Sequence, residues 1–190
     1  MFKLKLPKKN LRRYNQGLID DTIIGFARDK KAIVYGARAL NENLPKPIHK
    51  KTIDWDMYVN KPSSNAKYLE KKLDKVFGRD QFYTRKGVHE GTYNVRSRGL
   101  NIKSNKDDYT VADMTRPYEK VPYETSLDGV KFAKMSYLKK KINILLSDAQ
   151  YEYRRTKDRR TLAKIKIYEN AARRLGLNGN WLFKLGKFIS

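Results

Sequence analysis

The sequence predicts an α/β (α+β) fold in which a small mixed sheet is followed by a helical C-terminal segment. Short apolar runs alternate with amphipathic helical segments over residues 18–122, an order typical of a sheet covered by helices. After Pro117 and Pro122 the composition changes to long segments with helical periodicity. The length of 190 residues suits one such domain with a small helical addition. We therefore expect a basic arm at 1–17, a sheet domain at 18–122 and a helical segment at 123–190.

The first third of the chain is expected to contain one long helix and two core strands joined through a tight turn. Helical spacing of Ile19, Ile23 and Phe26 predicts a helix over residues 18–29, and an apolar run at 31–35 predicts the first strand. The later elements expected are a helix at 66–77 ended by Gly78, strands at 81–85, 92–98 and 109–114, and helices at 130–148 and 158–175.

The chain carries no cysteine, which excludes disulfides, thiolate metal sites and a cysteine nucleophile. Its first residues are basic, but no long apolar run follows them, so we expect no signal peptide. No segment approaches the roughly 20 apolar residues of a membrane span. We therefore expect a protein that is cytoplasmic or virion-associated and not secreted.

The strongest compositional feature is positive charge. The chain has 43 Lys and Arg against 20 Asp and Glu, which gives a net charge of +23. A surplus of this size favours polyanionic partners, and nucleic acid, RNA more than DNA, is expected ahead of an anionic membrane surface. Tyrosines beside basic residues, suited either to stacking on unpaired bases or to the core, are Tyr14, Tyr83, Tyr151 and Tyr153.

Two carboxylates separated by one residue are the clearest candidates for a functional site. In Asp54–Trp55–Asp56, strand geometry would place both acids on one face. Two neighbouring carboxylates stay ionised at neutral pH when a cation binds between them. Oxygen ligands suit Mg²⁺, which is held by one or two carboxylates together with substrate phosphates. The alternative is that both acids belong to an exposed strand edge or a turn.

A glycine turn upstream of these acids adds to the pattern. The apolar run Ile33–Tyr35 ends at Gly36, where the backbone can turn sharply and the following helix can direct free N–H groups at phosphate. Arg38 lies in the first turn of that helix, where it can reach a nucleotide phosphate or remain a solvated surface side chain.

Gly36–Ala37, a short helix and Asp54–Trp55–Asp56 together resemble the sequence pattern of the DNA polymerase β-like nucleotidyltransferase superfamily. The GARAL turn is also similar to that of abortive-infection nucleotidyltransferase toxins and of viral poly(A) polymerases. The resemblance extends over residues 33–165 and implies a sheet of nucleotidyltransferase type with a third carboxylate on a later strand. Asp113, in the strand-like run at 109–114, is the residue that matches it.

The resemblance implies a metal-dependent transfer of an NMP from an NTP to an acceptor hydroxyl, above all on RNA or tRNA, with Mg²⁺ or Mn²⁺ as the cofactor. The implied catalytic and metal-binding residues are Asp54, Asp56 and Asp113. The implied nucleotide-binding residues are Gly36, Ala37, Arg38 and Lys134. The pattern departs at Ala37, where the superfamily has serine or glycine, and this removes a potential hydroxyl contact to the triphosphate.

Other functions fit the same residues. A protein that keeps this fold but catalyses nothing would bind nucleic acid through its basic surface, as a structural component of a virion or a ribonucleoprotein. A toxin of this kind would instead modify a protein hydroxyl. The apolar tail at 181–188 is a candidate contact for a protein partner or for the core. His49 and His89 lie in polar segments and are expected to be incidental.

Overall fold

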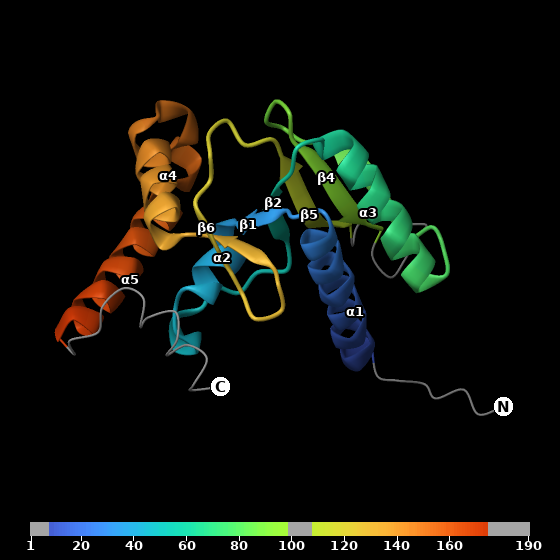
Figure 1. Cartoon of the computed structure of the whole chain (residues 1–190), viewed down its shortest axis with the longest axis horizontal. Helices are drawn as coiled ribbons and strands as arrows, with labels where there is room; N and C mark the ends of the chain where they lie inside the picture. The colour runs from blue at the N-terminus through green and yellow to red at the C-terminus, as the bar shows by residue number, and fades with distance from the viewer. Residues whose placement is uncertain (1–7, 99–107, 175–190) are drawn as a thin grey trace.

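The structure, a computed structural model, describes residues 8–98 and 108–174 (Figure 1). The helices are α1 (Lys8–Asp29), α2 (Gly36–Glu42), α3 (Pro62–Phe77), α4 (Met135–Ser147) and α5 (Arg155–Arg174), with short 3₁₀ helices η1 (Lys46–Ile48) and η3 (Ala149–Arg154). The strands are β1 (Ile33–Tyr35), β2 (Trp55–Tyr58), β3 (Phe82–Lys86), β4 (Tyr93–Ser97), β5 (Tyr109–Thr115), β6 (Tyr123–Thr125) and β7 (Lys131–Ala133). Within these two ranges, no helix has the length and apolar character needed to cross a lipid bilayer.

All seven described strands belong to one mixed sheet, in the order β3-β4-β5-β2-β1-β7-β6. Strand β2 pairs in parallel with β5, and β1 pairs in parallel with β7, while the other neighbours are antiparallel. The register sets Asp56 on β2 opposite Tyr35 on β1 and opposite Asp113 on β5. The centre of the sheet therefore brings together residues that are far apart in the sequence.

One face of the sheet is closed by α1 and α3. Helix α3 packs on β3, β4 and β5, and α1 packs against α3. Alternation along β2 directs Trp55 and Met57 into this core, and the indole of Trp55 donates a hydrogen bond to Asp20 on α1 at 2.8 Å. The large wholly buried side chains of this core include Ile19, Ile23, Phe26, Leu69, Leu73 and Phe82.

The opposite face of β1 and β2 looks toward the C-terminal helices. Tyr137 on α4 donates a hydrogen bond to the Tyr58 hydroxyl on β2 at 3.2 Å. Helix α4 also contacts α2 and α5. Figure 1 shows α4 and α5 on the other side of the molecule from α1 and α3. Because residues i and i+2 of a strand share a face, Asp56 lies on the same side as Tyr58 and looks toward α4.

The α/β architecture with a mixed sheet is confirmed, and its differences from the expected elements are local. Helix α1 begins at Lys8, so part of the segment expected as a loose arm is helical. A β6–β7 hairpin occupies part of 123–133, and the helix expected from residue 130 begins only at Met135. Each of these strands has three residues, too few to show a period. The division of the chain at 17 and 122 stays a prediction, and the tail at 181–188 lies outside the described residues.

The core predicts which substitution destabilises the fold. Phe26 on α1 is wholly buried, and its ring centroid lies 6.2 Å from that of Tyr68 on α3. We expect Phe26→Ala to lower the free energy of unfolding by roughly 3–5 kcal/mol, because it removes buried apolar surface and leaves a cavity. Urea titration followed by circular dichroism measures the change. Leu127→Ala, at a side chain that is 93% exposed, is the control and should cost less than about 0.5 kcal/mol; equal losses would contradict this core.

Candidate active site

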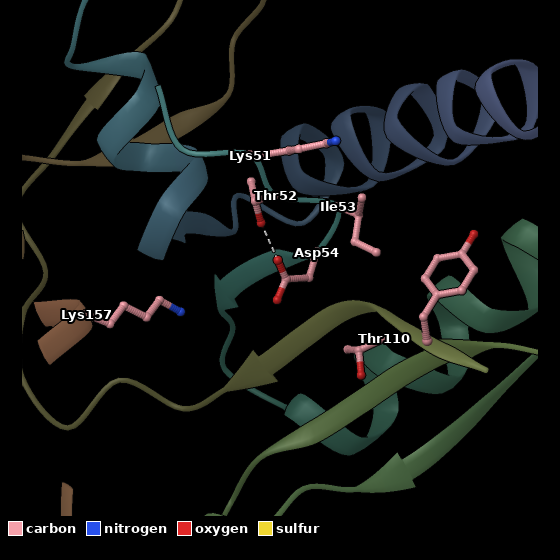
Figure 2. A pocket seen from close by; sticks show the side chains of 7 residues that line it. Lys51, Thr52, Ile53, Asp54, Thr110 and Lys157 are labelled. Carbon is pink, nitrogen blue, oxygen red and sulfur yellow. Dashed lines mark hydrogen bonds between the residues drawn. The ribbon is translucent and has the colours of Figure 1, made fainter. Parts of the chain in front are cut away.

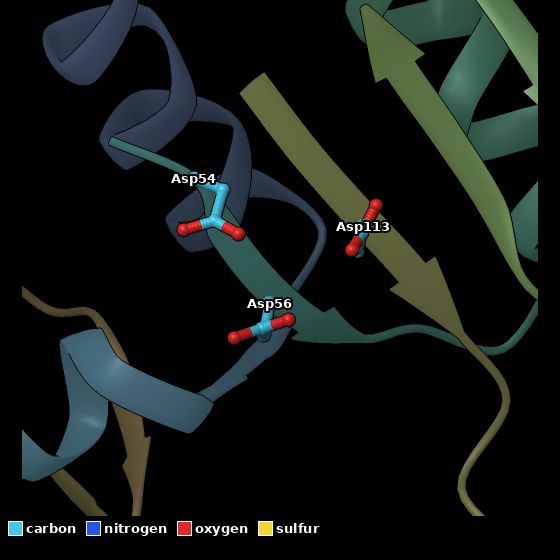
Figure 3. Close-up of side chains that lie close together, drawn as sticks. All are labelled: Asp54, Asp56 and Asp113. Atoms are coloured by element: carbon cyan, nitrogen blue, oxygen red, sulfur yellow. The ribbon is translucent and has the colours of Figure 1, made fainter. Parts of the chain in front are cut away.

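Three aspartates from two adjacent strands meet on the sheet face that looks toward α4 (Figure 3). Asp54 immediately precedes β2, Asp56 lies within β2, and Asp113 lies beside Asp56 on the parallel strand β5. One carboxylate oxygen from each residue lies within 4.8 Å of the other two. Strand alternation places Asp54 and Asp56 on one face, and the register with β5 adds the third acid. We call these three residues the acidic cluster.

Neighbouring side chains hold two of the three carboxylates in place. The Thr52 hydroxyl donates a hydrogen bond to Oδ1 of Asp54. Asn94, which lies opposite Asp113 on β4, donates from Nδ2 to Oδ1 of Asp113. These bonds restrict rotation of both carboxylates, so the acidic cluster is preorganised by its own surroundings.

The carboxylates of the acidic cluster repel one another. Burial, together with the charges of Asp54 and Asp113, raises the pKa of Asp56 to about 7. Burial also raises the pKa of Asp113, although the hydrogen bond from Asn94 opposes this shift. A divalent cation would offset the repulsion, and an oxygen-only ligand set fits a hard ion such as Mg²⁺ or Mn²⁺. The residues present therefore fit such an ion.

Gly36 is required where it lies because the Asp56 carboxylate occupies the space of a side chain. Its φ of +66° is in the left-handed region, which favours glycine. A Cβ atom at this position would lie 1.9 Å from Oδ2 of Asp56. The glycine turn seen in the sequence is thus explained by close contact between the backbone and the acidic cluster.

Basic side chains of the C-terminal helices lie on the same side of the sheet as Asp56. Lys141 on α4 donates from Nζ to the Tyr58 hydroxyl, and this nitrogen lies 4.3 Å from the centroid of the Tyr35 ring. Burial lowers the pKa of Lys141 to about 8, and the charge of Asp56 opposes that shift. The charges of Lys141 and Lys157 in turn oppose the rise in the pKa of Asp56. The acidic cluster therefore faces positive charge across the site.

A pocket of about 510 Å³ opens beside Asp54 (Figure 2). Asp54 forms one wall, and Lys157 on α5 extends toward it from the opposite side. The remaining lining residues are Lys51, Thr52, Ile53, Tyr109 and Thr110. The pocket combines opposite charges with hydroxyl and apolar side chains, a mixture suited to an anionic ligand with a ring system.

Arg38, which was expected near the phosphates, is held against α1 and the start of β2. Its Nη2 donates to Asp20 at 2.8 Å and to the Ile53 carbonyl at 3.4 Å, and its Nε donates to the Asp54 carbonyl at 3.3 Å. The guanidinium carbon lies 4.3 Å from the centroid of the Trp55 ring. Arg38 therefore positions the segment that carries Asp54, and its nucleotide-binding role stays a prediction.

Lys134 makes its ion pair with Glu124 and not with the acidic cluster. Its side chain is exposed, its Nζ is 3.8 Å from Oε1 of Glu124, and it does not line the pocket beside Asp54. Ala37 follows Gly36 as the second residue of α2. Of the four residues implied as nucleotide ligands, the structure brings Gly36 into contact with the acidic cluster, and the roles of Ala37 and Lys134 stay predictions.

Asn94 and Lys141 were not identified as site residues from the sequence. Asn94 is one polar residue among several on an alternating strand, and nothing local distinguishes it. Lys141 lies between Leu138 and Ile142, which are both buried, so its place beside the apolar stripe of α4 is a weak signal. Which lysine of α4 faces Asp56 depends on how the helix packs on the sheet, and periodicity does not determine this.

Comparison with known proteins assigns the fold to a class. No protein-family model matches the chain, and the search of curated proteins found no match. Solved structures do match, and the chain has the fold of the Megavirus polyadenylate synthase. The resemblance seen in the sequence is therefore confirmed for the fold.

The Megavirus polyadenylate synthase matches with a TM-score of 0.59 and 20% identity, over 80% of this chain and 31% of that chain. JHP933 from Helicobacter pylori matches with a TM-score of 0.46 and 15% identity, over 78% of this chain and 61% of that chain. Another H. pylori protein, provisionally described as a nucleotidyltransferase, matches with a TM-score of 0.45 and 16% identity, over 77% of this chain and 62% of that chain. This chain spans less than two thirds of each of these proteins, and at these identities the likeness concerns the fold alone.

Gly36→Ala should damage the acidic cluster more than it damages the fold. The new methyl group would displace the Asp56 carboxylate, in addition to the cost of about 1 kcal/mol for alanine at positive φ. We expect the affinity for Mn²⁺, measured by calorimetry, to fall by about tenfold or more. Gly78→Ala is the matched control, since Gly78 has a φ of +64° and no atom near its Cβ position. Equal Mn²⁺ affinity in the two variants would show that the close contact has no consequence.

The raised pKa of Asp56 predicts that stability depends on pH. The ordinary pKa of aspartate is about 4, so between about pH 4 and pH 7 the metal-free folded protein keeps a proton that the unfolded chain loses. Its free energy of unfolding should therefore fall as pH rises through this window, and Asp56→Asn should remove the fall, with a gain of roughly 1–3 kcal/mol at pH 8. Urea titrations in EDTA across this range test the sign. Parallel pH profiles for wild type and Asp56→Asn would contradict it.

Proposed function

We propose that this protein is a metal-dependent nucleotidyltransferase that moves an NMP from an NTP to an acceptor hydroxyl on RNA, tRNA included. The observation that carries the proposal is the acidic cluster, in which one carboxylate oxygen from each aspartate lies within 4.8 Å of the other two at the parallel pair β2 and β5. The nucleotidyltransferase fold and the basic residues opposite the cluster support it.

In this proposal the triphosphate binds between the acidic cluster and the C-terminal helices. Lys157 supplies a positive charge from across the pocket beside Asp54. Lys141 supplies a second, which its hydrogen bond to Tyr58 and its contact with the Tyr35 ring hold in a fixed position. Both amines can donate to phosphate oxygens. The acids hold the cation and the lysines hold the phosphates, so the two charged walls serve different parts of one ligand.

In the transfer step, the acceptor hydroxyl oxygen bonds to the α-phosphorus, and the bond from that phosphorus to the α–β bridging oxygen breaks. Pyrophosphate leaves with the electron pair of the broken bond. The hydroxyl proton passes to Asp113, whose Oδ1 accepts from Asn94 and whose Oδ2 is the second proton-accepting atom. Burial raises the pKa of Asp113 and thereby favours this transfer. A divalent cation held by the acidic cluster supplies neutralisation of the developing phosphate charge.

RNA is the acceptor that the chain's chemistry favours. The net charge of +23 gives an attractive field for any polyanion. The matched Megavirus protein is a polyadenylate synthase, an activity in which RNA is the acceptor. Both observations support RNA ahead of a protein hydroxyl.

Loss of two carboxylates should abolish transfer without unfolding the protein. We expect Asp54→Ala/Asp56→Ala to reduce the labelling of total cellular RNA by about 10³-fold or more, because stabilisation of phosphate charge by a bound cation contributes several kcal/mol. The assay supplies each α-labelled NTP separately with Mg²⁺, and the labelled nucleotide identifies the base preference. A parallel reaction with total protein tests the alternative acceptor.

Asp21→Ala is the control for this experiment, since Asp21 is an exposed acid on α1 outside the acidic cluster. It should label RNA as the wild type does. Circular dichroism and thermal unfolding establish that all three proteins are folded. Undiminished labelling by the double variant would refute the assignment of the acidic cluster.

A protein that binds nucleic acid without catalysis is the second candidate, and the net charge of +23 favours it. Such a protein would bind RNA with a steep dependence on salt and would gain no nucleotide affinity from Mg²⁺. The enzyme, in contrast, should bind a non-hydrolysable NTP analogue more tightly when Mg²⁺ is present. Nucleotide binding with and without Mg²⁺ therefore separates the two functions even where no labelling is detected.

A further inference from the structure

Three aromatic rings from two separate parts of the chain form a row at the surface. The ring of His89 lies 5.9 Å from that of Tyr151, and the ring of Tyr151 lies 6.5 Å from that of Tyr153, centroid to centroid. His89 belongs to the turn between β3 and β4, whereas the two tyrosines belong to η3. We call these three residues the stacking track. It is a contact between the β3–β4 turn and η3, and the proposed function assigns no role to its residues.

Backbone geometry at Tyr151 explains why the two tyrosines lie together. Side chains at i and i+2 point apart in a regular helix. Tyr151 departs from helical geometry, with φ of −104° and ψ of 20°, and this kink within η3 brings the rings of Tyr151 and Tyr153 to one side.

The rings of the stacking track are open, unlike the stacked pair in the interior. Tyr35 and Tyr58 lie 4.1 Å apart at an interplanar angle of 22°, which is a closed stack. Both steps of the track have an angle of 44°, so the rings are tilted and do not stack on one another, and Tyr151 in the middle is half-buried. Tyr153 is 76% exposed, and His89 is exposed as well. Open aromatic faces at a basic surface are the feature on which unpaired bases stack.

The turn that carries His89 leads into the strand that contacts the acidic cluster. Strand β4 leaves the turn that carries His89, and its second residue, Asn94, donates a hydrogen bond to Asp113. A positive charge on His89 would lower the pKa of Asp113. Tyr153 is followed directly by Arg154, which pairs with Asp158, and by Arg155, which pairs with Glu152 at the surface. The track thus lies between the strand that contacts Asp113, the residue assigned to the acceptor hydroxyl, and the start of α5.

We propose that His89, Tyr151 and Tyr153 bind the unpaired bases of a single-stranded RNA acceptor, with its terminal hydroxyl directed at Asp113. This inference rests on the proposed function, because it assigns the path of the acceptor to the same site. Bases stack on the ring faces, and Arg155, whose ion pair with Glu152 lies at the surface, contacts the phosphates. A duplex is excluded from this binding mode, because its bases are already stacked on one another. His89 thereby gains a role that its polar surroundings in the sequence did not indicate.

The test measures binding of a fluorescein-labelled, single-stranded RNA of about ten nucleotides by anisotropy, with no NTP and with EDTA present. We expect Tyr151→Ala/Tyr153→Ala to weaken binding roughly 10- to 100-fold, because stacking contributes about 1–3 kcal/mol for each base. Tyr151→Phe/Tyr153→Phe keeps both rings and should bind within about 3-fold of wild type. A blunt duplex of the same length should bind all of these proteins with similar affinity.

Tyr118→Ala is the matched control, since Tyr118 is a 90% exposed tyrosine that is not part of the stacking track. It should leave binding unchanged. Thermal unfolding establishes that each variant is folded, and Tyr153→Ala alone provides the test if the double variant is not. Single-stranded binding that survives the alanine substitutions overturns the proposal. The proposal is also overturned if the phenylalanine variant loses as much single-stranded affinity as the alanine variant. The same holds if the alanine variant loses as much affinity for the duplex as for the single strand.

This measurement needs no catalysis, so it separates the two proposals. If wild type labels no RNA but the alanine variant loses single-stranded binding, the proposed transfer fails and the stacking track stands. If wild type labels RNA and the alanine variant shows an unchanged KM for the RNA acceptor, the transfer stands and the stacking track fails. If the track acts as proposed, that KM rises while the KM for the NTP stays the same.

Discussion

The close approach between the Asp56 carboxylate and the backbone of Gly36 is the contact on which the rest of the site depends. It is possible only without a Cβ atom, and it lets β1 end in a sharp turn directly beside an acid on β2. The parallel pairing of β2 with β5 then adds Asp113 to the same small area. The buried core on the far side of the sheet offsets the repulsion that this concentration of charge produces.

The acidic cluster and the lysines opposite it form two charged walls of the site, and burial makes the ionised state of each wall costly. Burial disfavours the ionised form of Asp56 and also the ionised form of Lys141, whose pKa values shift in opposite directions. A ligand that carries a cation and phosphates together satisfies both walls at once. The metal-free and nucleotide-free protein therefore holds charge patterns that a metal–nucleotide complex would complete, and this fits a site organised for its ligand before binding.

The sequence predicts the parts of this molecule that depend on local spacing. The period of two placed Asp54 and Asp56 on one face, and the resemblance to a known superfamily pointed to Asp113, which lies beside them. The strands β6 and β7 escaped prediction because three residues show no period. Lys141 and Asn94 escaped because their positions depend on how a helix packs on the sheet and on strand register, which are properties of the tertiary fold. The contacts of Arg38 with Asp20 and with a backbone carbonyl also depend on the tertiary fold, and its nucleotide-binding role stays a prediction.

Strand β7 lies between β1 and β6 and runs almost directly into α4, the helix that carries Lys141. Strand β1, which pairs with β7, runs directly into Gly36. The Gly36 turn and the start of α4 are thus continuous with neighbouring strands of a single sheet. The hydrogen-bond ladder between β1 and β7 connects the turn that touches Asp56 to the helix that carries Lys141.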